Sequence, residues 1–526
     1  MEVESHPGLY YLQRQRLLGP GVGIQKDYDR IYNQGQRSIG WPKGEERIFA
    51  RLARPNTVAV LGAALGDEGK GRFVDNKIDA LSATPGVDIV YVVRYQGGNN
   101  TGHTVENNDG IKLALHLIPS SIMHPDAIGF IDKGVVIHAE DLVTEAQYVE
   151  ARVGDLRGKI ILSPDAILAT DLERAEEVLN RGRNSKTTGG TGRGISVAYA
   201  HYYDKLGLKV FDLLDEKWRE IFGSQYGQYE RLFAAFGKDL ASTQVPDFYA
   251  AKMRGENKSR LVGTKAEFLD RLESARDWLL GRDMIRNTFA LHRQLLTDIH
   301  SGVIFEGAQA LGLHPWLGTT PDATGSDTSI NGILQGTGVW KSTDIADRIG
   351  VFKATYTSSV GSRRMPTHID LNNLPEDLSP DQEWGMWVRE EAHEYGTTTG
   401  RPRDILHLDL AMLTYNANMA GIEALAATHL DIASKNVQIR VCTHYTDQQG
   451  NIIPYQSGLH HLESVVPQYI ELPGWDGEAC RQAKNIDELP KNAANYLAFI
   501  QARTGFPIVA TTTGPRRQDL IAFPGY

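Results

Sequence analysis

Short apolar runs joined by glycine turns recur along the chain from about residue 57 onward. Examples are TVAVLG at 57–62, VDIVYVVRY at 87–95, IGFIDKGVVI at 128–137 and SGVIFEG at 301–307. Runs without polar alternation are typical of strands that are buried on both faces, as in parallel sheets. The pattern predicts an α/β fold with a largely parallel central sheet flanked by helices.

A different pattern occupies residues of about 212–300, where apolar residues recur at spacings of three and four, as in FLDRLESARDWLL. This spacing is typical of amphipathic helices, so we predict a helical insertion within a domain of residues 55–526. Residues 1–54 are polar, dotted with aromatic residues and rich in arginine. We predict that they form an N-terminal extension.

The composition favours a globular protein over a nucleic-acid binder or a membrane protein. The 526 residues include 41% hydrophobic and 23% charged residues, which is typical of a globular protein, and the net charge of −10 argues against a general nucleic-acid binder. No apolar run approaches the ~20 residues of a membrane span, and the N-terminus has no secretory signal pattern. Only two cysteines are present, which fits a reducing compartment. We therefore expect a cytoplasmic protein that binds no membrane.

The stretch LGAALGDEGKGRF at 61–73 follows the first apolar run and is dense in glycine. A strand, a glycine turn, Lys70 and a helix starting near Gly71 would direct backbone N–H groups at an anion, in a P-loop-like arrangement. The phosphate-loop pattern GxxxxGK[ST] fails twice, because Ala64 replaces its first glycine and Gly71 its hydroxyl residue. Asp67 and Glu68 are also unusual beside phosphate. A tight turn with surface charge is the alternative.

Further loops carry candidate chemistry. RYQGGNNTGHTV at 94–105 contains His103, which titrates near neutrality and is a candidate general acid, although a lone histidine is more often a locally bonded turn residue. TTGGTGRGI at 187–195 suits a phosphate or ribose. YGTTTGRPRDI at 395–405 places two guanidinium groups around a proline, an arrangement suited to a dicarboxylate. Each loop by itself is also compatible with a solvated turn.

The order and wording of these loops together resemble the adenylosuccinate synthetase family. The matching motifs, from about Thr57 to Pro524, are GDEGKG, RYQGGNNTGHT, LHLIPS, TGRG, FEGAQ, YGTTTGRPR, LD after a strand, and TTGP. The family couples IMP and L-aspartate and uses GTP to phosphorylate the purine 6-oxygen before aspartate displaces that phosphate. The resemblance thus implies a ligase of purine biosynthesis with GTP as co-substrate, Mg²⁺ as cofactor and a homodimeric assembly.

The resemblance also implies roles for individual residues. Asp67 would remove the purine N1 proton and bind Mg²⁺ together with the Gly102 carbonyl, and His103 and Gln309 would stabilise the reacting 6-oxygen. The residues implied for GTP are Gly66, Glu68, Gly69, Lys70, Gly71, Gly102, Thr104, His429, Asp431, Thr512 and Gly514. Those implied for IMP are Asn100, Thr191, Lys205, Thr324 and Val360. Those implied for aspartate are Thr398, Thr399, Arg401 and Arg403.

Several positions depart from the family pattern. Lys205 stands where an arginine would reach the neighbouring subunit's IMP phosphate, and His429 replaces the lysine of TKLD. TSSVGSRRMPT replaces TRVGAGPFPT, so that an arginine is lost at Ser359. Two alternatives therefore stay open: the same chemistry on a modified purine nucleotide or with ATP as donor, and a nucleotide-binding regulatory protein without turnover. Retention of Asp67, Lys70 and His103 argues against the latter.

Overall fold

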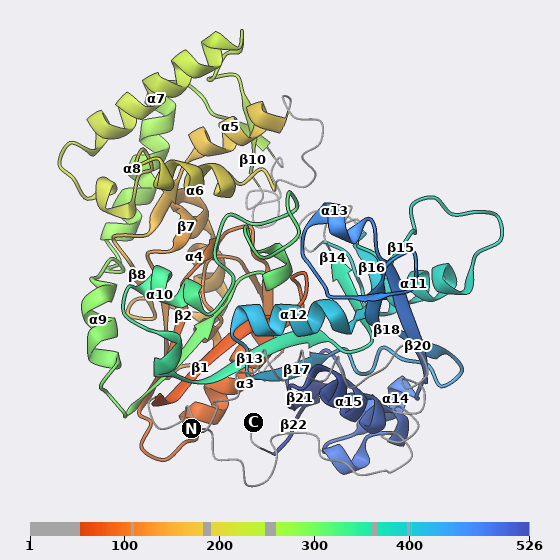
Figure 1. Cartoon of the computed structure of the whole chain (residues 1–526). Coiled ribbons are helices and arrows are strands. Elements are labelled where there is room, and N and C mark those ends of the chain that lie inside the picture. Colours follow the sequence, from red (N-terminus) through yellow and green to blue (C-terminus); the bar gives the residue numbers. More distant parts are fainter. Residues whose placement is uncertain are drawn as a thin grey trace, which may run out of the picture.

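A computed structural model describes residues 53–106, 110–181, 191–247, 259–359, 365–396, 400 and 402–524. At its centre lies a nine-stranded sheet with the order β22-β21-β17-β13-β1-β12-β2-β6-β8 (Figure 1). Every neighbouring pair is parallel except β21 and β22. The strands are β1 (Arg54–Gly62), β2 (Ile89–Arg94), β6 (Ala127–Ile131), β8 (Ile160–Leu162), β12 (Ser301–Glu306), β13 (Ile345–Lys353), β17 (Ala424–Thr428), β21 (Ile508–Thr512) and β22 (Leu520–Ala522). The predicted fold class is confirmed.

Both faces of this sheet are buried, as the unbroken apolar runs predict. In β1, Val58 and Val60 pack in one cluster with Phe73 and Ile78 of α3 (Lys70–Ser82). Ala59 and Leu61, which alternate with the two valines along the strand, belong to a second cluster on the opposite face. The other helices are α4 (Ala139–Val153), α5 (Asp171–Arg181), α6 (Ile195–Tyr203), α10 (Asn331–Thr337), α11 (Pro380–Glu391), α12 (Leu410–Ala420), α13 (Leu459–Leu462), α14 (Gly477–Gln482) and α15 (Lys491–Thr504), besides α7 to α9 below.

One predicted run divides between two sheets. The stretch 128–137 supplies the end of β6 and the start of β7 (Val135–His138), and β7 pairs with β3 (Gly97–Gly98) and β9 (Ile167–Ala169) in a small parallel sheet. The chain turns at Gly134, where a Cβ would lie 2.2 Å from the carbonyl oxygen of Tyr95. Only glycine allows this close approach, so the turn separates the two strands.

The section predicted to be helical contains α7 (Trp218–Ala235), α8 (Lys265–Leu280) and α9 (Thr288–Leu295). Figure 1 shows α7 and α8 at one end of the molecule, away from α11 and α14. The section also contains an antiparallel ribbon of β10 (Gln244–Pro246) and β11 (Ser259–Leu261), which the helical spacing did not predict.

A second sheet, also not predicted, has the order β14-β16-β18-β19, with β15 beside β16 and β20 beside β18. It is mixed, because β16 and β18 are parallel and the other pairs antiparallel. The remaining strands are β14 (Tyr356–Ser359), β15 (His368–Ile369), β16 (Asp404–Asp409), β18 (Gln438–Thr446), β19 (Ile452–Ile453), β20 (Val466–Pro473), β4 (His103–Glu106) and β5 (Lys112–Leu115).

Two further observations bear on the sequence predictions. The central strand β1 begins at Arg54, whereas the sequence predicts that Arg54 belongs to the N-terminal extension; residues 1–52 lie outside the described part of the chain. Among the helices that the structure describes, none combines the length and apolar character needed to cross a membrane.

Candidate active site

A cavity of about 1620 Å³ lies at the carboxyl edge of the central sheet. Parallel strands direct their carboxyl ends to one edge, so the loops that follow β1, β2, β12, β17 and β21 meet there. The cavity brings together most of the residues singled out in the sequence: Gly66, Asp67, Gly69, Lys70, Gly71, Asn100, Gly102, His103, Thr191, Gln309, Thr324, Arg403, His429, Asp431, Thr512 and Gly514.

The loop after β1 has the geometry expected of an anion cradle. Gly69 has φ of 86° and ψ of 26°, a left-handed conformation that favours glycine, and the helix α3 begins at Lys70. The first residues of this helix, Lys70 and Gly71, line the cavity, and the N–H groups of a helix N-terminus favour negative charge. Asp67 also has a positive φ, of 56°. Its side chain is about one-third exposed on the cavity wall.

Glu68, one of the residues implied for GTP, lies in the same loop. Its carboxylate is buried and turns back into its own loop, where it accepts a hydrogen bond of 2.7 Å from the N–H of Gly66. It also pairs with Lys70 at 2.7 Å. Its carboxylate thus holds the loop and the lysine; it does not line the cavity, and its role in GTP binding stays a prediction.

His103 is held by charged neighbours at the end of the second strand. Arg94 Nη1 lies 3.2 Å from His103 Nδ1, and because a guanidinium only donates, Nδ1 is the acceptor and Nε2 carries the proton. Nε2 lies 3.6 Å from Oε1 of Glu306. Burial lowers the pKa of His103 to about 4, with Glu306 opposing and Arg94 adding to the shift. The imidazole is therefore neutral near pH 7 and presents an N–H donor.

Gln309 lies on the loop after β12, opposite the first glycine loop. Its amide Nε2 donates to Thr101 Oγ1 at 2.6 Å and to Asn100 Oδ1 at 3.3 Å. The residue has a φ of 57°, and its backbone passes close to the end of β1. Three loops are thus fastened to one another around the centre of the cavity.

A network of charges links Asp67 to the loop that follows α11. Arg403 Nη2 lies 2.9 Å from Asp67 Oδ2, and Nη1 lies 2.7 Å from Glu394 Oε2. Although burial opposes ionisation, Lys353 and Arg403 hold the pKa of Glu394 well below its usual value. Arg403 therefore has a fixed orientation with its fork at the cavity wall.

The network continues to His429. The hydroxyl of Tyr356 donates to Glu394 at 2.5 Å and lies 2.8 Å from Nδ1 of His429. Because the hydroxyl has a single proton, Nδ1 of His429 is the donor of the second bond. Burial, reinforced by Lys353, lowers the pKa of His429 to about 3, so this side chain is neutral where the family pattern has a charged lysine.

Comparison with known proteins matches this arrangement. The model of the adenylosuccinate synthetase family matches residues 59–521. The chain belongs to the adenylosuccinate synthetase family. Two relatives of that name are 32% identical over 467 residues in Citrifermentans bemidjiense and 31% identical over 474 residues in Caldanaerobacter subterraneus. These alignments cover 88% and 90% of this chain and 97% and 100% of the relatives.

Solved structures of two synthetases have the same fold as this chain. A fully ligated adenylosuccinate synthetase from Plasmodium falciparum superposes with a TM-score of 0.74 at 28% identity, over 89% of this chain and 99% of that one. The succinoaminodeoxyadenylate synthetase of cyanophage S-2L shares the fold, with a TM-score of 0.50 at 16% identity over 89% and 95% of the two chains. Family membership identifies the protein as a GTP-dependent ligase that forms C–N bonds, consistent with the joining of IMP and aspartate.

Some residues that resemble family positions are not placed at the cavity. Lys205 follows α6 on the exposed surface and is absent from the cavity lining. Val360, Thr398, Thr399 and Arg401 lie outside the described residues, as does the side chain of Thr104. Their roles stay predictions.

Sequence reasoning missed several charged residues of the site. Arg94 and Glu306 each end a buried apolar strand, and a charge at such a position is a local signal that could have identified them. Glu394 precedes the arginine loop by a few residues. Tyr356 and Arg481 have no local signal, because only the packing of distant segments brings Tyr356 to His429 and Arg481 to the cavity wall.

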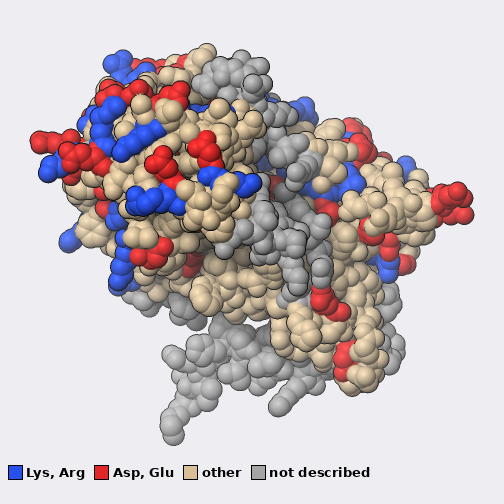
Figure 2. Space-filling model, turned by 90° about the horizontal axis from the view of Figure 1, so that it is seen from above, with Lys and Arg blue, Asp and Glu red and all other residues tan. Residues whose placement is uncertain are grey.

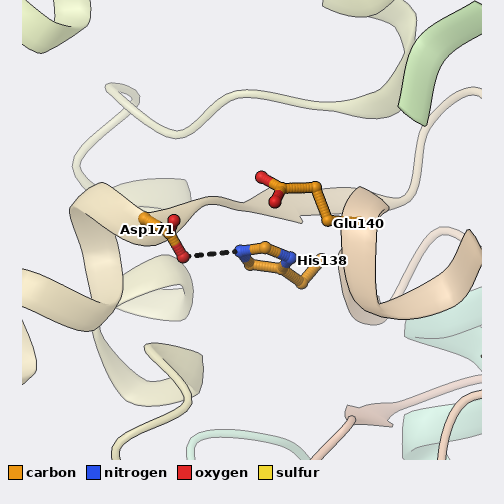
Figure 3. A group of neighbouring side chains, drawn as sticks. All are labelled: His138, Glu140 and Asp171. Carbon is orange, nitrogen blue, oxygen red and sulfur yellow. Dashed lines mark hydrogen bonds and ion pairs between the residues drawn. The ribbon is translucent and has the colours of Figure 1, made fainter. Parts of the chain in front are cut away.

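A second acid–histidine cluster, His138, Glu140 and Asp171, lies outside the cavity lining (Figure 3). His138 Nε2 lies 3.3 Å from Asp171, and ligand atoms of all three residues lie within 4.8 Å of one another. Arg260 and Arg271 pair with Asp171 at 2.9 and 3.1 Å, and Arg260 also pairs with Glu140 at 2.6 Å. Since arginines already neutralise the carboxylates, this is a buried ion-pair network that fastens β11 and α8 to α5.

Charges of both signs alternate on the molecular face seen in Figure 2. A nucleic-acid interface would concentrate lysine and arginine on one surface. No such concentration is seen among the described residues of this face.

Proposed function

We propose that the protein condenses IMP with L-aspartate, with GTP as phosphoryl donor, to give adenylosuccinate, GDP and phosphate. The observation that carries this proposal is the convergence of Asp67, Lys70, His103 and Gln309 on one cavity. These residues come from three loops far apart in the sequence, and together they supply a base, a phosphate-binding cation and two hydrogen-bond donors.

Each residue has a step in the proposed chemistry. Asp67 takes the proton from purine N1, so that the 6-oxygen becomes nucleophilic and attacks the γ-phosphorus, while GDP leaves. The Nε2–H of His103 and the amide of Gln309 stabilise the charge on the oxygens in transfer. The amine of aspartate then attacks C6, and the 6-oxygen leaves as part of inorganic phosphate. The N1 proton passes from Asp67 to solvent, the aspartate ammonium group releases two protons as the C6–N bond replaces the C6–O bond, and the leaving phosphate takes up one proton.

The donor set at Asp67 and Gly102 fits Mg²⁺, because a carboxylate and a backbone carbonyl are hard oxygen ligands and both residues line the cavity. When bound there, the ion would neutralise phosphate charge. The amides near Gly69 and the ammonium of Lys70 hold the donor phosphates.

The other predicted site residues are assigned to IMP, aspartate and the guanine base. Asn100, Thr191 and Thr324 lie along the cavity wall and are proposed for IMP, with Lys205 reaching from the neighbouring subunit and Val360 as a further contact. Arg403, with Thr398, Thr399 and Arg401, is proposed for aspartate. Asp431 is proposed to read guanine, with His429, Thr512 and Gly514 around the base.

We also propose a homodimer in the cytoplasm. The exposed segment around Lys205 carries Tyr203, Leu206 and Phe211, which are 71%, 66% and 58% exposed. Such apolar residues gathered near one segment support a contact surface. Cys442 and Cys480 are buried and unpaired, which supports a reducing compartment.

A nucleotide panel tests the proposal. Purified protein with Mg²⁺ and aspartate is offered IMP, dIMP, GMP and dGMP, each with GTP or ATP, and product is followed by its ultraviolet absorbance. We expect turnover with IMP and GTP to exceed every other pair. Preference for another acceptor or for ATP would support the altered-nucleotide alternative, and binding without turnover would support a regulatory protein.

A further inference from the structure

Arg481 lies at the proposed donor-base end of the cavity, and no motif of the sequence singles it out. It belongs to α14, its side chain is about one-third exposed, and it lines the cavity beside Asp431. Its Nε lies 3.0 Å from Oδ2 of Asp431. The guanidinium therefore contacts the carboxylate proposed to read the base.

Two acids on the far side fix Arg481. Nη2 lies 2.7 Å from Oε1 of Glu391, at the end of α11, and Nη1 lies 3.5 Å from Glu478, one turn earlier in α14. A guanidinium with partners in three directions has little rotational freedom. It therefore defines the plane and direction of the Asp431 carboxylate, which is 7% exposed.

The residues just before Asp431 are hydrogen-bonded to the loop of Thr512, which is also proposed to contact the base. The N–H of Leu430 donates to the Thr512 carbonyl at 3.1 Å, and the N–H of His429 donates to Thr512 Oγ1 at 3.2 Å. The two loops therefore form one rigid wall, and Arg481 braces that wall from the side of α11 and α14.

Protonation of Asp431 decides which base it fits. An ionised carboxylate accepts the N1–H and 2-amino hydrogens of guanine. A neutral carboxyl group can instead donate to adenine N1 and accept from its 6-amino group. Burial raises the pKa of Asp431, and Arg481 counteracts this shift. Other ionisable groups near the carboxylate are Arg72 of α3, Tyr356 of β14 and Cys480 of α14.

We propose that Arg481 is a specificity-determining residue for the donor base, which it serves by holding Asp431 as an ionised, oriented acceptor for guanine. The inference rests on the proposed function, in which Asp431 reads the donor base. Arg481 acts through Asp431 and is a positioning residue.

The test measures binding of GDP, IDP and ADP by calorimetry at pH 6 and pH 8, so that it needs no turnover. The variants are Arg481→Gln, which removes the charge, Arg481→Lys, which keeps it, and Glu391→Gln, which removes one brace without touching Asp431. Glu478→Gln removes the longer contact, 3.5 Å from Nη1, and should have the smaller effect of the two brace variants. Thermal unfolding checks that each variant is folded.

We expect Arg481→Gln to weaken GDP binding by roughly ten- to a hundredfold, the loss of one charge-assisted bond. The same variant should show a smaller preference for GDP over IDP, which lacks the 2-amino group. Its loss of GDP affinity should be larger at pH 6 than at pH 8. Arg481→Lys and Glu391→Gln should bind GDP with affinities between those of Arg481→Gln and wild type.

Unchanged GDP affinity in folded Arg481→Gln, or equal weakening of GDP, IDP and ADP at both pH values, would overturn the proposal. Absence of turnover in wild type, with selective GDP binding retained, would instead overturn the proposed function and leave the role of Arg481 standing. The two failures are therefore distinguishable.

Discussion

Asp67 and Arg403 are 2.9 Å apart, so that residues assigned to two different substrates share one ion pair. The pair closes the cavity wall between the glycine loop and the loop after α11. Arg403 has a second acid, Glu394, whose charge Lys353 also stabilises. Removal of Asp67 therefore leaves Arg403 paired with Glu394, and removal of Arg403 leaves Asp67 one-third exposed to solvent. We expect substitution of either residue to affect chemistry more than folding.

For Asp67→Asn we expect retained nucleotide binding and a turnover number lowered by about 10²–10⁴-fold, as is typical when a positioned general base is lost. The amide keeps the size of the side chain but cannot take the N1 proton. Steady-state kinetics with GTP, IMP and aspartate saturating measures the change. Activity close to wild type would exclude Asp67 as the base.

For Arg403→Leu we expect the aspartate KM to rise by roughly ten- to a hundredfold, because a guanidinium–carboxylate bond contributes about 1.5–3 kcal/mol. Arg403→Lys should recover only part of the loss, since lysine has no fork. Aspartate kinetics at saturating IMP and GTP measures both variants. If KM and turnover number stay unchanged, the amino-acid site lies elsewhere.

At the scale of elements, the site depends on how closely the loops pass the ends of the central strands. Gly62 ends β1, and a Cβ there would lie 2.3 Å from the carbonyl oxygen of Gln309 and 2.7 Å from Cβ of Ala310. Backbone atoms cannot yield as a flexible side chain can. The close packing of β1 against the loop after β12 thus fixes the position of Gln309.

Gly62→Ala should therefore lower the free energy of unfolding by about 1–3 kcal/mol, the usual cost of overpacking, and lower activity by displacing Gln309. Gly458→Ala is the matched control, because its Cβ would meet nothing within 4 Å. Urea unfolding and turnover are measured for both. Equal stability of the two variants would contradict this account of the strand end.

Some helices and strands could be predicted from the sequence and others could not. The runs that became β1, β2 and β12 were predictable because each is apolar throughout, and α3 begins at Lys70 next to the predicted Gly71. The second sheet was not predictable, because its strands have no comparable apolar runs and pair across long distances in the chain. The residues of the site differ in the same way. Asp67, His103 and Gln309 belong to local motifs and were predictable, whereas Tyr356 and Arg481 reach the site only through the packing of distant segments.

At the scale of the whole molecule, buried neutral histidines make stability depend on pH. The pKa of His429 is about 3 in the folded protein and near 6.5 in an unfolded chain. As the pH falls below 6.5, the unfolded state takes up a proton that the folded state does not. The contribution of His429 is thus complete above pH 6.5 and is lost progressively down to about pH 3.

We therefore expect the stability of wild type relative to His429→Gln to fall with decreasing pH below 6.5, by up to about 1.4 kcal/mol per pH unit. Comparison with a variant cancels other groups such as Asp409, whose pKa burial raises to about 6. Urea unfolding at pH 7.5, 6.0 and 5.0 measures the difference, with substitution of the exposed His460 as control. A difference that is constant over this range would contradict a neutral, buried His429.

The central claim is that GTP activates the purine 6-oxygen before aspartate replaces it, and oxygen tracing tests it most directly. IMP labelled with ¹⁸O at position 6 is incubated with the protein, GTP, aspartate and Mg²⁺, and the released phosphate is analysed by mass spectrometry. The account predicts one ¹⁸O in each phosphate formed with adenylosuccinate. Unlabelled phosphate would mean that water or aspartate accepts the phosphoryl group, and would contradict the account.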